Sequence, residues 1–224
     1  MVSHSFADTD FANAGGSAQT TTERVGVFHD YQRDGFYLNS SASVGFSNYE
    51  SKRSIGFLNE TARGETHGLS VGGQLATGYD FQVGGFLLGP TASVAYDHAQ
   101  IYGFAESGSA ADLTLRRQEA DSVVTNLGVH VSRPFVCRGI GWIPEVSLGV
   151  SRQHFNPNTI AAQFTAGGDA FRIKPQAGSS EFFLPGASLT ALLANGWSVR
   201  LSYDAILNPD SAEHRVNLSV NAGF

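Results

Sequence analysis

The sequence is short of the residues on which several protein classes depend. It has a single cysteine, Cys137, which excludes an internal disulfide framework. Only 15% of the residues are charged, against roughly 25% in an average soluble domain, so much of the surface is uncharged. No apolar run approaches the about 20 residues of a transmembrane helix. The net charge of −6 and the lack of a clustered Lys/Arg stripe argue against nucleic acid as a partner.

Glycine and phenylalanine are abundant instead. The 26 glycines and 16 phenylalanines stand against one methionine, and runs of helix-forming residues are scarce. This composition favours β structure. Because no linker or shift in composition divides the chain, we predict a single domain over residues 1–224.

The last residues, "EHRVNLSVNAGF", alternate strictly between polar and apolar side chains. A period of two predicts a strand with one polar face and one apolar face. The apolar positions are Val216, Leu218, Val220, Ala222 and Phe224. Such a strand fits either the edge of a soluble sandwich or one stave of a membrane barrel.

The same alternation recurs upstream. It covers residues 23–31, 36–47, 68–81, 87–97, 122–132, 142–151, 183–192 and 197–205. These lengths approach the about 9–11 residues that a tilted strand needs to cross a hydrocarbon layer, whereas strands of soluble sandwiches more often have about 5–6. The polar faces consist mainly of Gly, Ser, Thr and Asn, which do not build a dry core, while the apolar faces end in aromatic residues. We therefore predict an all-β, antiparallel outer-membrane β-barrel with a wet interior.

Loop lengths test this interpretation independently. Tight turns are predicted at 32–35, 82–85 and 194–197, and a moderate one at 133–141. Long loops are predicted at 51–67, 98–121 and 152–181, with a brief one at 207–214. Outer-membrane barrels have short periplasmic turns and longer external loops. This assignment puts the C-terminal residue on the periplasmic side.

The chain resembles the C-terminal translocator domain of classical monomeric autotransporters of Gram-negative bacteria. The likeness is carried by "DGFYLNSSASVGFSNYESKRSI", "GYDFQVGGFLLGPTASVAYDHAQIYGFAESG", "IPEVSLGVSRQHF", "LPGASLTALLANGWSVRLSYDAIL" and the terminal "HRVNLSVNAGF". The resemblance implies a twelve-stranded barrel in the outer membrane, a helix threading its lumen and an exported passenger domain upstream. Implied partners are outer-membrane lipid, the barrel-assembly machinery, which would recognise the C-terminal strand with Phe224, and periplasmic chaperones.

The start of the chain departs from that pattern. "SHSFADTDF" looks like the end of the third strand, so we expect about nine to ten of the twelve strands here, although single-chain barrels normally have an even count. The first strands, the lumen helix, the passenger and a signal peptide are expected upstream of Met1.

A few charged residues lie on the polar faces of the predicted strands. The alternation places six of them toward the lumen: Asp80, Asp97, Glu145, Arg200, Asp204 and Arg215. We expect them to pair across strands or to hydrogen-bond a polypeptide in the lumen. His130, Glu145 and Ser147 also fall near one another on the predicted lumen face, but a nucleophile needs an oriented base, and abundant serines meet that pattern by chance. No catalytic residue, metal site or cofactor is predicted.

The predicted function is to anchor and help export an upstream passenger domain. The alternative is a passive pore, or an adhesin-like barrel that binds through its long loops, especially 152–181. A third candidate is an outer-membrane hydrolase.

Overall fold

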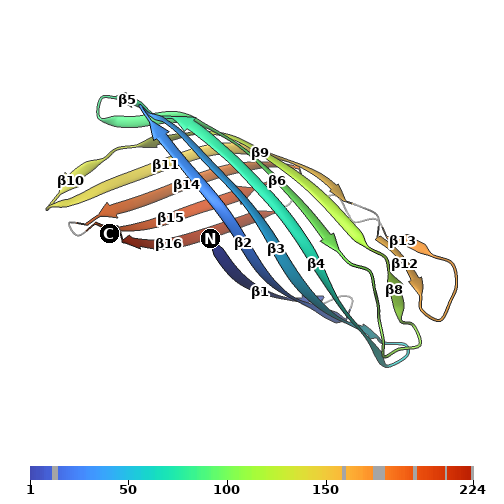
Figure 1. The fold of residues 1–224 in the computed structure, drawn as a ribbon. Helices are drawn as coiled ribbons and strands as arrows, with labels where there is room; N and C mark the ends of the chain where they lie inside the picture. The colour runs from blue at the N-terminus through green and yellow to red at the C-terminus, as the bar shows by residue number, and fades with distance from the viewer. Residues whose placement is uncertain (12–14, 158–159, 174–179, 194–195, 210, 223–224) are drawn as a thin grey trace.

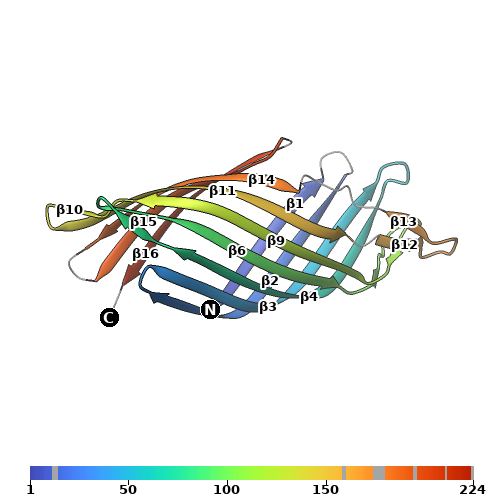
Figure 2. The ribbon, with the colours of Figure 1, turned by 90° about the horizontal axis from the view of Figure 1, so that it is seen from above.

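A computed structural model describes all residues except 12–14, 158–159, 174–179, 194–195, 210 and 223–224. Ten long strands follow one another as antiparallel neighbours in a single sheet. They are β1 (Val2–Phe11), β2 (Gly16–Arg33), β3 (Phe36–Ile55), β4 (Glu60–Tyr79), β6 (Phe86–Ile101), β9 (Gln118–Ser132), β11 (Ile140–Pro157), β14 (Glu181–Leu192), β15 (Trp197–Leu207) and β16 (Ala212–Ala222). The sheet curls along its width, as Figures 1 and 2 show from two directions. Among the described residues β1 and β16 form its two edges. The predicted all-β antiparallel architecture is confirmed.

Tight turns join the strands at one end of the sheet. The β2–β3 hairpin closes with Arg33 opposite Phe36, and Asp34 and Gly35 between them have φ angles of 50° and 85°. Positive φ at both central residues is the pattern of a type I′ turn, whose twist matches that of the strands. Short extensions, β5 (Phe81–Val83) and β10 (Phe135–Cys137), lead into equally short turns at Gly84-Gly85 and Arg138-Gly139. The predicted turns at 32–35 and 82–85 are confirmed, the turn within 133–141 is tighter than expected, and 194–195 lie outside the described residues.

The opposite end of the sheet corrects the prediction of a long loop at 51–67. Strand β3 continues to Ile55 and β4 begins at Glu60, so only residues 56–59 form the turn. The charged side chains of this segment suggested a loop. An antiparallel ladder is made by backbone groups, however, and its faces can lie in water.

The other two long loops contain a second, four-stranded sheet. It has the order β13 (Phe171–Ile173), β12 (Ile160–Phe164), β8 (Leu113–Leu115) and β7 (Phe104–Ala105), at the right of Figure 1. β7 and β8 come from the predicted loop 98–121, and β12 and β13 from 152–181. The rings of Phe164 and Phe171 lie 5.9 Å apart within this outer sheet. These connections are therefore partly regular structure, which local sequence patterns did not indicate.

The described residues do not form the buried core of a water-soluble sandwich. Among the described residues, the buried apolar side chains are Ile55, Ala62, Ala162 and Ala205. Large apolar residues instead line the surface, including Val27 at 72% exposure and Val216 at 71%. No helix in the described part of the chain is long and apolar enough to span a membrane. Since each Å² of apolar surface in water costs about 25 cal/mol, this surface needs a nonaqueous environment.

Candidate functional site

The polar face of the main sheet is concave. The Arg200 Nη2 on β15 lies 3.1 Å from the Glu145 Oε1 on β11, although β14 runs between these strands. The Arg24 Nη2 on β2 similarly lies 3.5 Å from the Ser70 Oγ on β4, across β3. Side chains on strands that are not neighbours meet where a sheet curls toward them. The alternate residues, which are largely apolar, occupy the convex face.

Five side chains gather on the concave face near the tight turns, and we call them the turn-end cluster. They are Tyr37, Asp80, His130, Glu145 and Arg200. The Asp80 Oδ1 lies 2.9 Å from the His130 Nε2, and these side chains are 22% and 12% exposed. The direction of approach does not make a hydrogen bond, so this buried oxygen has no hydrogen-bond partner among the described residues.

The remaining members complete a half-open polar site. The ring centroid of Tyr37 lies 6.5 Å from that of His130. In the Arg200–Glu145 pair the side chains are 47% and 29% exposed, so both keep donors and acceptors that a passing chain can reach. The cluster therefore offers both charge signs and a phenol to a polypeptide on the concave face.

One close approach fixes the Tyr37 ring. A Cβ atom added at Gly78 would lie 2.2 Å from the Tyr37 Oη and 2.7 Å from the carbonyl oxygen of Pro90. Glycine is required here because the phenol occupies the space that any larger side chain would need.

The other predicted lumen residues share the concave face without joining the cluster. Asp97 lies against Gly72, and Asp204 stands opposite Arg215 in the β15–β16 register. Arg215 nevertheless donates to Glu213 on its own strand, with an Nε–Oε1 distance of 2.6 Å. Of the six predicted charges, the structure thus joins Glu145 with Arg200 as an ion pair.

The predicted assembly strand forms the β16 edge. Val216, Leu218 and Val220 are exposed on the apolar face, and Ala222 is half-buried at the end of the strand. Phe224 lies outside the described residues. The role of these residues in assembly stays a prediction.

Sequence reasoning missed the contact that occupies His130. The alternation suggested an arrangement of His130 with Glu145 and Ser147, whereas the structure places His130 against Asp80 and Glu145 against Arg200. Within the described residues Ser147 makes no hydrogen bond to His130. The alternation of side chains had placed Asp80 toward the lumen, but it gave no signal that Asp80 would contact His130.

A second cluster ties the outer loops to the β3–β4 hairpin. The Arg53 guanidinium forms a bidentate pair with Glu106, which is 8% exposed, and also donates to the carbonyl oxygen of Ala111 at 2.9 Å. This hydrogen-bonded pairing raises the pKa of Arg53 above its ordinary value. The Glu106 carboxylate also accepts the amide of Leu113 at 2.9 Å. Charge-assisted bonds of this kind are the strong ones, so the loop is firmly attached.

Glu60 provides the next attachment. Its Oε2 accepts the Ser109 hydroxyl at 2.7 Å and the Ala110 amide at 2.8 Å. The Ser109 bond, followed by the Ala110 bond, lowers the pKa of the Glu60 carboxyl.

Comparison with known proteins gives one family. The family model for the autotransporter β-domain matches residues 1–204. The translocator domain of the autotransporter NalP from Neisseria meningitidis superposes with a TM-score of 0.70 at 19% identity, over 92% of this chain and 68% of that one. The β-domain of the Bordetella autotransporter BrkA gives a TM-score of 0.67 at 16% identity, over 98% of this chain and 77% of that one. No curated protein sequence matches the chain.

The family match agrees with the geometry. At these identities the two solved structures show the fold, a curled antiparallel sheet like the wall of an outer-membrane barrel. Domains of this family reside in the bacterial outer membrane and serve transport rather than catalysis. The predicted resemblance, location and non-enzymatic nature are confirmed. The chain belongs to the autotransporter β-domain family, the translocator domains of type V secretion.

Proposed function

We propose that residues 1–224 form one domain that anchors a passenger domain, located upstream in the same polypeptide, and helps to export it across the outer membrane. The observation that carries this proposal is the pairing of a convex apolar face with a concave face bearing the turn-end cluster. The convex face meets lipid, and the concave face offers polar contacts to a chain in transit.

The concave face leaves room for such a chain. A hollow of about 380 Å³ is lined by Gly128, Gly149 and Gly186 on three neighbouring strands, with Asp204 and Arg215 at its side. Since glycine has no side chain, a polypeptide can approach the sheet backbone closely there.

Assembly partners follow from the exposed β16 edge. We propose that the barrel-assembly machinery recognises its apolar residues together with Phe224, and that periplasmic chaperones shield the convex face before insertion. Unprotected edges and apolar faces aggregate in water, which gives both partners a physical task.

The test uses the full-length gene with its passenger. Replacing Arg200 or Glu145 by alanine removes one partner of the half-exposed pair, and we expect less passenger at the cell surface, measured by access to an added protease. Arg172→Ala on β13 is the control, because this exposed arginine lies on the outer sheet. Unchanged export and unchanged barrel stability in both variants would contradict the role given to the concave face.

The regular outer sheet favours a second candidate, a barrel that binds a ligand through its loops. Glu106 and Arg53 hold part of this sheet in place, as a binding surface requires. Deleting β12 and β13 would then abolish surface binding and leave export intact. The opposite result supports export alone.

A further inference from the structure

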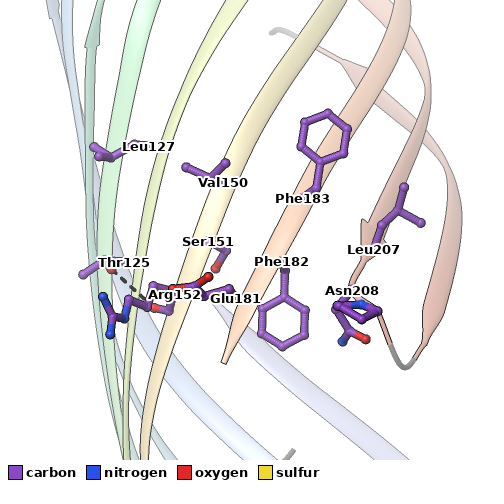
Figure 3. A pocket seen from close by; sticks show the side chains of 11 residues that line it. Thr125, Leu127, Val150, Ser151, Arg152, Glu181, Phe182, Phe183, Leu207 and Asn208 are labelled. Atoms are coloured by element: carbon purple, nitrogen blue, oxygen red, sulfur yellow. Dashed lines mark hydrogen bonds between the residues drawn. The ribbon is translucent and has the colours of Figure 1, made fainter. Parts of the chain in front are cut away.

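A groove lies on the convex face of the sheet at its loop end. It has a volume of about 750 Å³ and crosses β9, β11, β14 and β15 (Figure 3). Its apolar wall consists of Leu127, Val150, Phe183 and Leu207. Neighbouring strands are about 4.8 Å apart, so the groove is roughly 14 Å wide, more than a single hydrocarbon chain needs.

The outer rim of the groove marks the limit of the apolar band. Across β9, β11 and β14 the register aligns Leu127, Val150 and Phe183 in one row. The next row toward the loops, two residues further along each strand, holds Thr125, Arg152 and Glu181. Three strands change from apolar to polar at the same row, which is where hydrocarbon gives way to headgroups on a barrel wall.

Arg152 is available for an anion at this rim. Its side chain is exposed and forms no hydrogen bond or ion pair within the part of the chain that the structure describes. Its backbone oxygen accepts the Thr125 hydroxyl at 3.3 Å, the dashed line in Figure 3. A guanidinium presents paired donors that match phosphate geometry.

We propose that this groove binds the phosphorylated, multiply acylated glycolipid that forms the outer leaflet of the bacterial outer membrane. The acyl chains lie along Leu127, Val150 and Phe183, and Arg152 contacts a phosphate of the headgroup. The groove lies at the loop end, which faces the outer leaflet. Its width admits more than one acyl chain. The Arg152 guanidinium lies directly beyond the apolar wall, on the side of the loops. Basic groups at this level are the recognised means of headgroup binding. This inference rests on the membrane location and not on passenger export.

The experiment is native mass spectrometry of the full-length protein, folded in detergent, with defined lipids added. The probes are bisphosphorylated lipid A, the same lipid after enzymatic dephosphorylation, and phosphatidylglycerol. We expect the wild-type protein to retain lipid A at least about tenfold better than its dephosphorylated form, since a charge-assisted contact of this kind contributes at least one decade. Arg152→Gln removes that difference, and Arg172→Gln preserves it. We expect Val150→Phe to narrow the groove and to weaken the binding of both the phosphorylated and the dephosphorylated glycolipid.

Three results would overturn the proposal. One is equal binding of the phosphorylated and dephosphorylated glycolipids by the wild type. A second is retention of phosphatidylglycerol as strong as that of lipid A, which assigns the groove to general phospholipid. The third is an unchanged preference in Arg152→Gln, verified as folded by its heat-dependent gel mobility. If that variant does not fold, the wild-type comparison of the lipids still decides the proposal.

Discussion

The phenol of Tyr37 occupies the space in which Gly78 lacks a side chain, so strands β3 and β4 interlock on the concave face. A methyl group at position 78 would meet both this ring and the Pro90 carbonyl. The strands therefore depend on a shape match as well as on their hydrogen-bond ladder.

We expect Gly78→Ala to destabilise the folded domain by about 1–3 kcal/mol, the usual cost of overpacking. Urea unfolding in detergent micelles measures this loss. Gly73→Ala on the same strand is the matched control, because its added Cβ would find its nearest atom, the Ser41 carbonyl oxygen, at an ordinary 3.6 Å. Equal losses at the two positions would mean that the Tyr37 contact is unimportant.

A pair of neighbouring residues on β16 tests which face meets lipid. Leu218 is 70% exposed on the apolar face, and Asn217 lies on the polar face. Arginine at a lipid-facing site near the membrane centre costs about 2–4 kcal/mol, so Leu218→Arg should lower the unfolding free energy in lipid vesicles by that order. Asn217→Arg should change it little. A larger loss for Asn217→Arg would reverse the assignment of the faces.

The Arg53–Glu106 pair should control the attachment of the first outer loop. Glu106→Ala leaves Arg53 without its carboxylate partner and Leu113 without an acceptor, and losing bonds of this kind typically costs about 1–3 kcal/mol. We expect limited proteolysis within residues 102–117 to become roughly tenfold faster or more, while the barrel keeps its heat-dependent gel mobility. Glu65→Ala serves as the control, since Glu65 is an exposed residue of the same hairpin. Equal cleavage rates in the two variants would contradict the anchoring role.

Glu60 makes the same loop sensitive to acid. Its pKa is lowered from the ordinary 4.5 by the bonds from Ser109 and Ala110. The stabilisation by the carboxylate is therefore complete above about pH 4.5 and is lost as the pH falls through the lower folded pKa. Hydrogen exchange should show the protection of the Ala110 amide falling below pH 4.5 in the wild type. In Glu60→Gln, protection should vary less with pH over this range. If the protection of the Ala110 amide in the wild type did not change across this pH range, its dependence on the Glu60 carboxylate would be ruled out.

Most of the fold could be predicted from the alternation of polar and apolar side chains along the strands. Runs such as Val146 to Val150 have a period of two, which predicts strand and face together, and the tight turns followed from Asp34-Gly35 and Gly84-Gly85. The segment 51–67 was misjudged because Arg53 and Glu60 are charged, whereas their strands are held by backbone bonds and by partners about fifty residues away.

The contacts within the candidate site were harder to predict, because they too join residues that lie far apart in the chain. The alternation of polar and apolar residues was enough to place Glu145 and Arg200 on the same, polar face of the sheet. Their contact depends on how far the sheet curls across β14, and the placement of His130 beside Asp80 depends on the same curvature across β6. Neither quantity is encoded in a local stretch of sequence.

Strands β3 and β4 are 20 residues long, about twice what a tilted strand needs to cross the hydrocarbon layer. The surplus, at about 3.4 Å per residue and a tilt near 40°, raises the hairpin tip roughly 25 Å above the lipid. The ion pair between Arg53 and Glu106 attaches the outer sheet to this raised hairpin. Under the export function proposed above, a passenger segment that leaves the bilayer on this side would pass along the raised β3–β4 hairpin before it reaches open solvent.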